Sequence, residues 1–359
     1  MEMNESMLVV RDAYRAMRAS GQTRHRDIAE HLGISEGHLI AAHVGGPDPE
    51  ARYALRARRL RPQWADLIKS LEWLGEVMAL TRNASCVHEK DGVYRKVSDK
   101  GDVGLVLGED IDLRIFYQRW HEGFAVQETS DRGEQLSLQF FDARGDAVHK
   151  VFLRPASDVD AYHALVTRFA YPDQKAGWAS SGGASVTQAL RQDIDVVAFR
   201  AAWRALRDTH DFTTMLDRFG LQRLEAFVLA DRDQARSVAT DSVKTLLEEA
   251  SRQEVPIMVF VGNQGVIQIH TGLVSRIMVM GPWLNVLDKG FNLHLRMDHV
   301  AHAWVVHKPT DDGVVTSLEL FDREGEVIAM FFGARKPGKP ELPAWRALVD
   351  SLCEEAIHA

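Results

Sequence analysis

The chain has 359 residues, of which 45% are apolar and 26% charged, and a formal net charge of −8. This length allows two domains, and the composition is typical of an ordinary soluble globular protein. The negative charge argues against a nucleic-acid binder, no stretch approaches the roughly 20 apolar residues that span a bilayer, and no secretory signal opens the chain, so we expect a cytoplasmic protein without membrane insertion.

A helix-turn-helix pattern occupies residues 26–42, with Ser35 as the cap of the second helix and Glu36 in its first turn. A regulator reads bases from that helix with Arg, Lys, Asn or Gln, and here the helix offers only histidines. We therefore interpret the motif as a packing element and expect no nucleic-acid partner. A DNA-binding regulator stays as the alternative from another class of function.

An arginine-rich segment, RYALRARRLR at residues 52–61, follows this motif. We interpret it as the solvated face of a helix rather than as a patch that binds nucleic acid. Strands are expected next, because the sequence alternates or runs apolar between turn residues. These segments are 93–98, 104–108, 136–142 and 147–154. Gly145 and Gly325 stand in two hairpin turns that need a positive φ.

The chain contains an internal duplication. Residues 111–148 align without a gap to residues 291–328, and the same offset of 180 pairs Met78 with Met258 and Asn83 with Asn263. Each copy begins with helical periodicity and continues as an antiparallel sheet, which indicates the α+β class. The predicted organisation is an N-terminal repeat over 1–172, a Gly/Ser-rich linker over 173–188 and a C-terminal repeat over 189–359.

Residues that one copy has and the other lacks are the candidates for function. His210 has no histidine at its counterpart near residues 21–23, and either Asp208 or Thr209 can cap the following helix, which would place His210 in the first turn. Arg114 is the second asymmetry, because His294 occupies its ungapped counterpart. Taken alone, His210 is more simply an exposed residue of the first turn, and Arg114 is either the polar face of a strand or a cation presented into a cleft.

Other sites of known chemistry find little support in the sequence. The two cysteines, Cys86 and Cys353, cannot build a disulfide framework or a cysteine-rich metal site, and no HExxH, CxxC, P-loop or dinucleotide motif is present. His88 and His270 stand near strand ends and are possible secondary ligands, although a surface or hydrogen-bonded role is the simpler interpretation for both.

Several long blocks together resemble one family. WRALRDTH, PIMVFVGNQGVIQIHTG, MGPWLNVLDKGFNLHLR and FFGARKPGKPELPAWRALV are similar to segments of the bacterial haemin-degrading factors, which are cytoplasmic haemin transport proteins of Gram-negative haem-uptake systems. The resemblance covers essentially the whole chain. It implies two large antiparallel β-sheets stacked at the centre and flanked by helices, with b-type haem held by the C-terminal half.

The resemblance also implies which residues bind haem. His210 maps to the axial ligand of the iron, and imidazole is a strong haem ligand. Arg114 maps to the opposite face of the haem and would be the catalytic residue if haem is degraded. The remaining pocket residues implied by the family are Phe116, Arg223, Lys308, Phe332 and Arg335. Phe332 replaces a tyrosine of some members.

Three functions follow as hypotheses. The first is a protein of haem-iron utilisation that receives imported haem and degrades it, with haem oxygenase-like activity that needs an external reductant and O₂. The second is a haem chaperone that delivers haem to a separate oxygenase. The third is the DNA-binding regulator. The expected partners of the first two are haem, a haem importer, and a haem oxygenase or reductase.

Overall fold

The computed structural model of the chain describes residues 2–46, 52–131, 133–178, 194–335 and 338–352. The residues group into two compact units. Unit 1 consists of Met1–Arg82, Glu89–Ser185 and Asn263–Gln268, and unit 2 of Asn83–His88, Val186–Gly262 and Ile269–Ala359. Each unit therefore contains a short segment from the opposite half of the sequence.

The strands form two large antiparallel sheets, which confirms the predicted α+β class. In the described part of the chain each sheet has nine strands, in the orders β1-β7-β8-β9-β2-β3-β15-β14-β13 and β10-β16-β17-β18-β11-β12-β6-β5-β4. Among these described residues no helix combines the length and the apolar character that crossing a membrane requires.

Among the described residues, in each half of the sequence three α-helices precede the first strand, one follows that strand and one follows the last strand. In the first half the elements are α1 Glu2–Ala19, α2 His25–His31, α3 Glu36–Ala42, β1 Leu55–Arg59, α4 Trp64–Ser70, β2 Val77–Arg82, β3 Cys86–Gly92, β4 Val97–Lys100, β5 Val103–Leu107, β6 Asp112–Phe116, β7 Glu122–Ser130, β8 Gly133–Phe141, β9 Ala147–Leu153 and α5 Val159–Phe169.

The second half repeats this order, with α9 in the place of α4 and α10 in the place of α5. Its elements are α6 Val196–Arg204, α7 Asp211–Phe219, α8 Arg223–Leu229, β10 Ala235–Val238, α9 Ser242–Arg252, β11 Ile257–Gly262, β12 Val266–Gly272, β13 Ile277–Met280, β14 Trp283–Asp288, β15 Phe291–Arg296, β16 His302–Thr310, β17 Gly313–Phe321, β18 Val327–Gly333 and α10 Pro343–Asp350.

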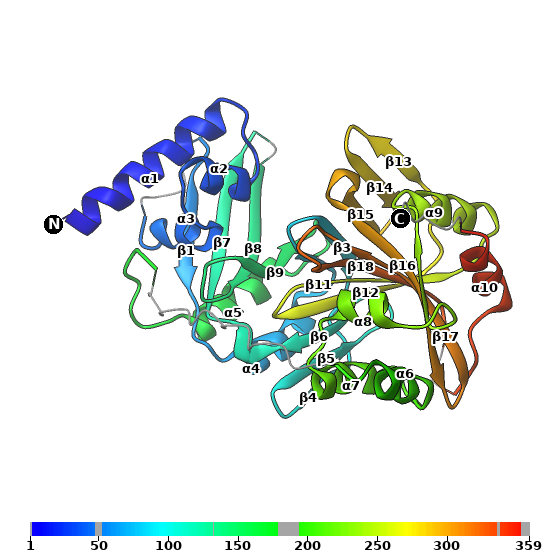
Figure 1. Ribbon diagram of the computed structural model, residues 1–359. Helices are drawn as coiled ribbons and strands as arrows, with labels where there is room; N and C mark the ends of the chain where they lie inside the picture. The colour runs from blue at the N-terminus through cyan, green and yellow to red at the C-terminus, as the bar shows by residue number, and fades with distance from the viewer. Residues whose placement is uncertain (1, 47–51, 132, 179–193, 336–337, 353–359) are drawn as a thin grey trace. The chain divides into compact units, whose positions relative to one another are not determined.

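Helices cover both faces of the hairpin strands in each unit. In unit 1, α1, α2 and α3 lie beside β7 and β8 (Figure 1) and pack on Phe124, Val126 and Phe141. On the opposite face, α4 and α5 pack on side chains such as Leu138. Strand residues alternate between two faces, so each strand contributes to two separate apolar cores.

Unit 2 is built in the same way. Helices α6, α7 and α8 pack on Val306 and Phe321, whereas α9 and α10 pack on the opposite face, where Leu318 and Phe331 are buried. The predicted hairpin turns are confirmed, because Gly145 and Gly325 adopt φ values of +85° and +83°.

The helix-turn-helix pattern is present as α2 and α3 and behaves as a packing element. The side chain of Ser35 caps α3 by accepting a hydrogen bond from the backbone N–H of His38, as predicted. Leu39 and Ile40 of α3 are fully buried in the core of unit 1. This burial leaves α3 little surface with which to enter a DNA groove.

Two predictions of secondary structure are wrong. Residues 52–61 form no helix, because Leu55 and Ala57 point into the core while Arg56 and Arg58 are exposed, and this period of two belongs to strand β1. The strand expected over 93–98 begins only at Val97. Lys96 has a φ of +53°, a left-handed conformation that interrupts a strand.

Candidate functional site

An apolar patch lies on the surface of the sheet in unit 2. It consists of Met258 and Phe260 on β11 and Met330 and Phe332 on β18, all of which are half-buried. Met258 stands opposite Phe332 in the strand register and Phe260 opposite Met330. Their side chains therefore share one face, where the rings of Phe260 and Phe332 meet edge to face at 5.0 Å between centroids.

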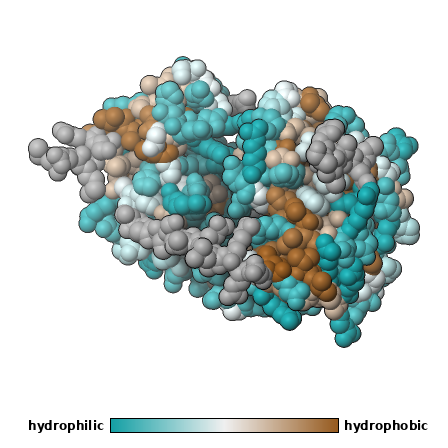
Figure 2. Space-filling view, in the orientation of Figure 1, coloured by the Kyte–Doolittle hydropathy of each residue, from teal (hydrophilic) through white to brown (hydrophobic). Residues whose placement is uncertain are grey.

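The patch is incompletely covered because the helices on this face pack on other strands. The core formed by α6, α7 and α8 reaches Val306 on β16 and Phe321 on β17, and it includes no residue of the patch. Figure 2 shows apolar side chains gathered on the surface around α8, where Val228 is 65% exposed. An apolar surface beside polar groups is typical of a ligand site.

A buried ionic cluster borders the apolar patch. Glu319 on β17 stands opposite Met330 and lies on the same face of the sheet. Its carboxylate accepts two hydrogen bonds from the guanidinium of Arg223, at 2.5 and 2.9 Å, and one from the ammonium of Lys308 at 2.8 Å. Ser317 donates a fourth hydrogen bond at 2.9 Å. We call Arg223, Lys308 and Glu319 the ionic triad.

Burial and pairing act against each other in the triad. Desolvation alone would raise the pKa of Glu319, but Arg223 and Lys308 outweigh it and hold that pKa well below its ordinary value. Burial lowers the pKa of Lys308 to about 8, although Glu319 opposes the shift. The triad therefore has two cationic groups that share one carboxylate at the edge of an apolar surface.

His210 lies at the start of α7 with its side chain 88% exposed. Its ring Nδ1 is 2.7 Å from the Oδ1 of Asp208, which also accepts a hydrogen bond from the backbone N–H of His210. These two hydrogen bonds lower the pKa of Asp208. The prediction that Asp208 or Thr209 caps α7 is wrong, because Asp208 binds His210 and the N-cap position is His210 itself.

Two further predicted pocket residues lie on or just after β18. Phe332 belongs to the apolar patch, and Arg335 follows the end of the strand with a half-buried side chain. Unit 2 thus contains five of the predicted site residues. These are His210, Arg223, Lys308, Phe332 and Arg335.

Arg114 and Phe116 belong to unit 1, on strand β6. They share one face of the strand with Asp112, because buried residues alternate with them. The guanidinium of Arg114 is about one third exposed and pairs with the carboxylate of Asp112. This pairing fixes the direction of a cationic group that would otherwise move freely.

His88 and His270, the possible secondary ligands, are both buried in unit 2 around Phe291. The ring of His270 stacks on Phe291 with centroids 3.7 Å apart, and His88 lies 5.0 Å from the same ring. Within the described ranges no group of three His, Cys, Asp or Glu residues is placed to hold a metal ion. Packing around an aromatic ring accounts for the position of both histidines.

Sequence reasoning did not identify Met258, Phe260, Met330 or Glu319 as site residues. The strand alternation in IMVFVG and VIAMFFG places the first three on one face, so a signal was present. This alternation could not show that the helices on this face leave the apolar patch on β11 and β18 incompletely covered, because that depends on tertiary packing. Glu319 gave no signal, since a glutamate in a strand is normally exposed.

A family model described as the haemin-degrading HemS.ChuX domain matches residues 33–169 and again residues 220–352. The chain belongs to this haemin-degrading family. The two matches fall on the two copies of the duplication, so each copy corresponds to one HemS.ChuX domain.

Relatives of the HemS.ChuX family cover nearly the whole chain. The hemin transport protein HmuS of Yersinia pestis is 37% identical over 335 residues, which are 93% of this chain and 94% of the relative. The crystal structure of holo-PhuS, a heme-binding protein from Pseudomonas aeruginosa, superposes with a TM-score of 0.92 at 44% identity, covering 97% of this chain and 99% of PhuS.

A second solved structure of the family is ChuS, described as an E. coli heme oxygenase. It superposes with a TM-score of 0.84 at 35% identity and covers 96% of this chain and 99% of ChuS. The family thus includes relatives named for transport, for haem binding and for haem degradation. Its fold is shared over the full length of both copies.

Proposed function

We propose that this chain is a cytoplasmic haem-binding protein of haem-iron utilisation, with the haem against the apolar patch of unit 2. The observation that carries the proposal is a half-exposed apolar face bordered by a buried cluster with an excess of positive charge. A macrocycle needs apolar surface for its rings and cationic groups for its two propionates. Membership in the haemin-degrading family supports the same ligand.

His210 is the proposed axial ligand of the haem iron. Its Nδ1 is engaged by the carboxylate of Asp208, which leaves Nε2 as the nitrogen available to iron. Histidines that bind metals commonly donate their other ring N–H to a carboxylate, which orients the ring and makes it more basic. Its exposure at the start of α7 lets a ligand approach without rearrangement of the core.

The other pocket residues take roles that match their positions. Phe332 would contact the macrocycle, and Arg335, half-buried directly after β18, would bind a propionate. Arg114 and Phe116 on β6 are proposed for the distal face, with Arg114 supplying a positive charge held by Asp112. Bound haem supplies the redox chemistry, and the chain orients it and restricts access to it.

We propose oxidative degradation of haem as the leading activity, with electrons from an external reductase and with O₂ as co-substrate. The alternative is transfer of intact haem to a separate haem oxygenase. A relative named as a heme oxygenase favours the first, and relatives named as hemin transport proteins favour the second. In both cases an importer on the cytoplasmic side would deliver the haem.

Titration with hemin tests the ligand. The wild type is expected to give a Soret band of a histidine-ligated haem, and His210→Ala to shift that band and weaken binding by about 10-fold or more. His31→Ala, at an exposed histidine of α2, is the matched control and should leave the spectrum unchanged. An unchanged spectrum in His210→Ala would refute the axial assignment.

Reduction of the haem complex separates degradation from transfer. A chemical reductant is added in air with catalase present, so that peroxide formed in solution cannot attack the haem. Loss of the Soret band with formation of an open-chain tetrapyrrole supports degradation, and Arg114→Ala should slow it. A Soret band that persists without product contradicts degradation and supports the transfer function.

A further inference from the structure

Glu319 is the most completely enclosed acidic residue beside the proposed haem site. Its side chain has no exposed surface, and its two carboxylate oxygens accept hydrogen bonds from Arg223, Lys308 and Ser317. One carboxylate therefore fixes two cationic side chains that come from α8 and β16. The two cations cannot both leave Glu319 without stranding a buried negative charge.

Both cations of the triad contact the same aromatic ring. The guanidinium carbon of Arg223 lies 5.1 Å from the centroid of Phe212, and the ammonium of Lys308 lies 4.6 Å from it. Phe212 is only 1% exposed, and its ring packs edge to face on Trp203 with the ring centroids 4.8 Å apart. Cation–π contacts in a desolvated setting are stronger than at the surface, so they fix this ring firmly.

Phe212 connects the triad to His210. It is the second residue of α7, and His210 is the residue that precedes this helix. The side chain of His210 contacts Asp208 but is 88% exposed, so no core packing holds it. The position of His210 therefore depends on where the first turn of α7 is fixed, and Phe212 is the buried side chain of that turn.

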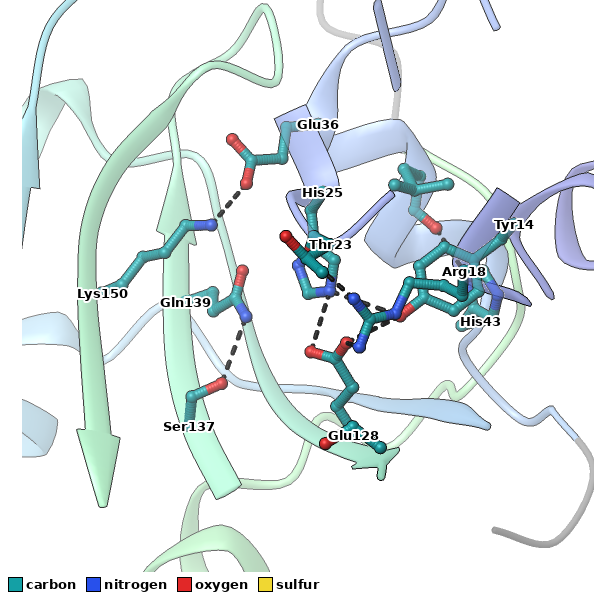
Figure 3. Close-up of polar contacts among 12 residues, drawn as sticks. Tyr14, Arg18, Thr23, His25, Glu36, His43, Glu128, Ser137, Gln139 and Lys150 are labelled. Carbon is teal, nitrogen blue, oxygen red and sulfur yellow. Dashed lines mark hydrogen bonds and ion pairs between the residues drawn. The ribbon is translucent and has the colours of Figure 1, made fainter. Parts of the chain in front are cut away.

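The equivalent place in unit 1 carries a different set of charges (Figure 3). By the offset of 180, Gln139 replaces Glu319 and Glu128 replaces Lys308. The turn glycines Gly33 and Gly220 align the helices with an offset of 187, which places His25 at the position of Phe212. There Glu128 pairs with His25 at 3.1 Å and with Arg18 at 2.6 Å. At these duplicated positions unit 1 therefore has neither the central carboxylate of Glu319 nor the phenyl ring of Phe212.

The geometry points to Glu319 as the positioning residue of His210. By holding Arg223 and Lys308 against Phe212, it fixes the start of α7 and with it the imidazole that is proposed to bind iron. This inference rests on the proposed function, since it concerns the same haem site. It also gives Arg223 and Lys308 a role in the protein before any haem is bound, in addition to the electrostatic attraction of propionates.

Glu319→Gln tests the inference, with Glu324→Gln as the control at an exposed glutamate of the β17–β18 turn. At saturating hemin, Glu319→Gln is expected to move the Soret band towards that of His210→Ala and to weaken binding by about 10-fold, as loss of a residue that supports a metal ligand does. The control should match the wild type. A Soret band of Glu319→Gln identical to wild type overturns the inference.

Phe212→Leu is the second variant, because it keeps an apolar side chain and removes the ring that both cations contact. Circular dichroism first establishes that each variant is folded, and a folded Phe212→Leu should show the same direction of spectral change. If His210→Ala changes the spectrum and neither variant does, only this inference fails. If His210→Ala changes nothing, the proposed axial ligand fails, whatever the variants show.

Discussion

Asn83 and Asn263 make the same hydrogen bonds in different units of the protein. Each side-chain oxygen accepts two backbone N–H groups from the residues that follow it, and each side-chain amide donates to two carbonyl oxygens. The acceptors are Gly262 and Ile328 for Asn83, and Arg82 and Val148 for Asn263. Each asparagine opens the segment that its half of the sequence contributes to the other unit.

Replacing either asparagine should destabilise the fold to a similar extent. Asn83→Ala and Asn263→Ala each leave backbone groups without a partner, and we expect a loss of about 2 kcal/mol in the free energy of unfolding. Urea denaturation followed by circular dichroism measures it, with the exposed Gln22→Ala as control. A loss no larger than that of the control would show that the amide side chains do not hold these segments.

Lys150 in unit 1 occupies the position that Met330 has in unit 2. Its ammonium and the guanidinium of Arg82 both pair with the buried carboxylate of Glu36, as Figure 3 shows for Lys150. Lys150→Met should cost about 3 kcal/mol of unfolding free energy, near the lower end for a broken buried ion pair because Arg82 still pairs with Glu36.

A double-mutant cycle with Glu36→Gln separates the pair from its surroundings. The double variant leaves no unpaired charge at position 150 or 36. Its loss of unfolding free energy should therefore be smaller than the sum of the losses in the two single variants. Additive losses would indicate that the two side chains do not interact. The hemin spectrum, which depends on the proposed ligand His210, should stay unchanged in all three variants.

The pH dependence of stability should reflect Glu128. Burial would raise the pKa of this carboxyl, but His25 and Arg18 outweigh it and lower the pKa to about 2 from an ordinary 4.5. As the pH falls below about 4.5, Glu128 becomes protonated in the unfolded state but stays ionised in the folded state. The stabilisation is therefore lost progressively towards pH 2. Glu128→Gln lacks this contribution.

Thermal unfolding at a series of pH values checks the direction in which the contribution of Glu128 to stability changes with pH. Glu128→Gln should melt below the wild type at pH 7, and the difference should shrink between pH 4.5 and pH 3. Glu324→Gln, at an exposed glutamate, should follow the wild type throughout. A difference that stays constant or widens on acidification would contradict the assignment of this titration to Glu128.

Local patterns in the sequence predicted much of the fold. The order of helices and strands and the positive φ of Gly145 and Gly325 follow from features within a few residues, and the duplication follows from aligning the sequence with itself. The exchange of residues 83–88 and 263–268 between units could not be predicted, because it depends on contacts between distant strands. The predicted linker lies mostly outside the described residues, and the predicted domain boundaries stay a prediction.

The candidate site was predicted less completely. Comparing the copies singled out His210 and Arg114, since an asymmetry between duplicates is visible in the sequence alone. The same comparison aligns Glu319 with Gln139 and Lys308 with Glu128. A charge difference between aligned strand residues is common, however, and it indicates a functional site only once the burial of those residues is known. Burial depends on the helices that pack above, which no short pattern encodes.

Met330 offers the most direct test of the apolar patch, because the duplication supplies the substitution. Met330→Lys introduces the residue that unit 1 has at this position, and it places a cation on the proposed macrocycle surface opposite Glu319 in the register. Burying that ammonium under haem would cost desolvation energy, so hemin affinity should fall by at least about 10-fold. Without hemin the half-buried side chain can extend into solvent, and the melting temperature should change little. Val279→Lys, at an exposed apolar residue of β13, is the matched control and should bind hemin like the wild type. Equal affinities in the two variants would place the haem elsewhere than on β11 and β18.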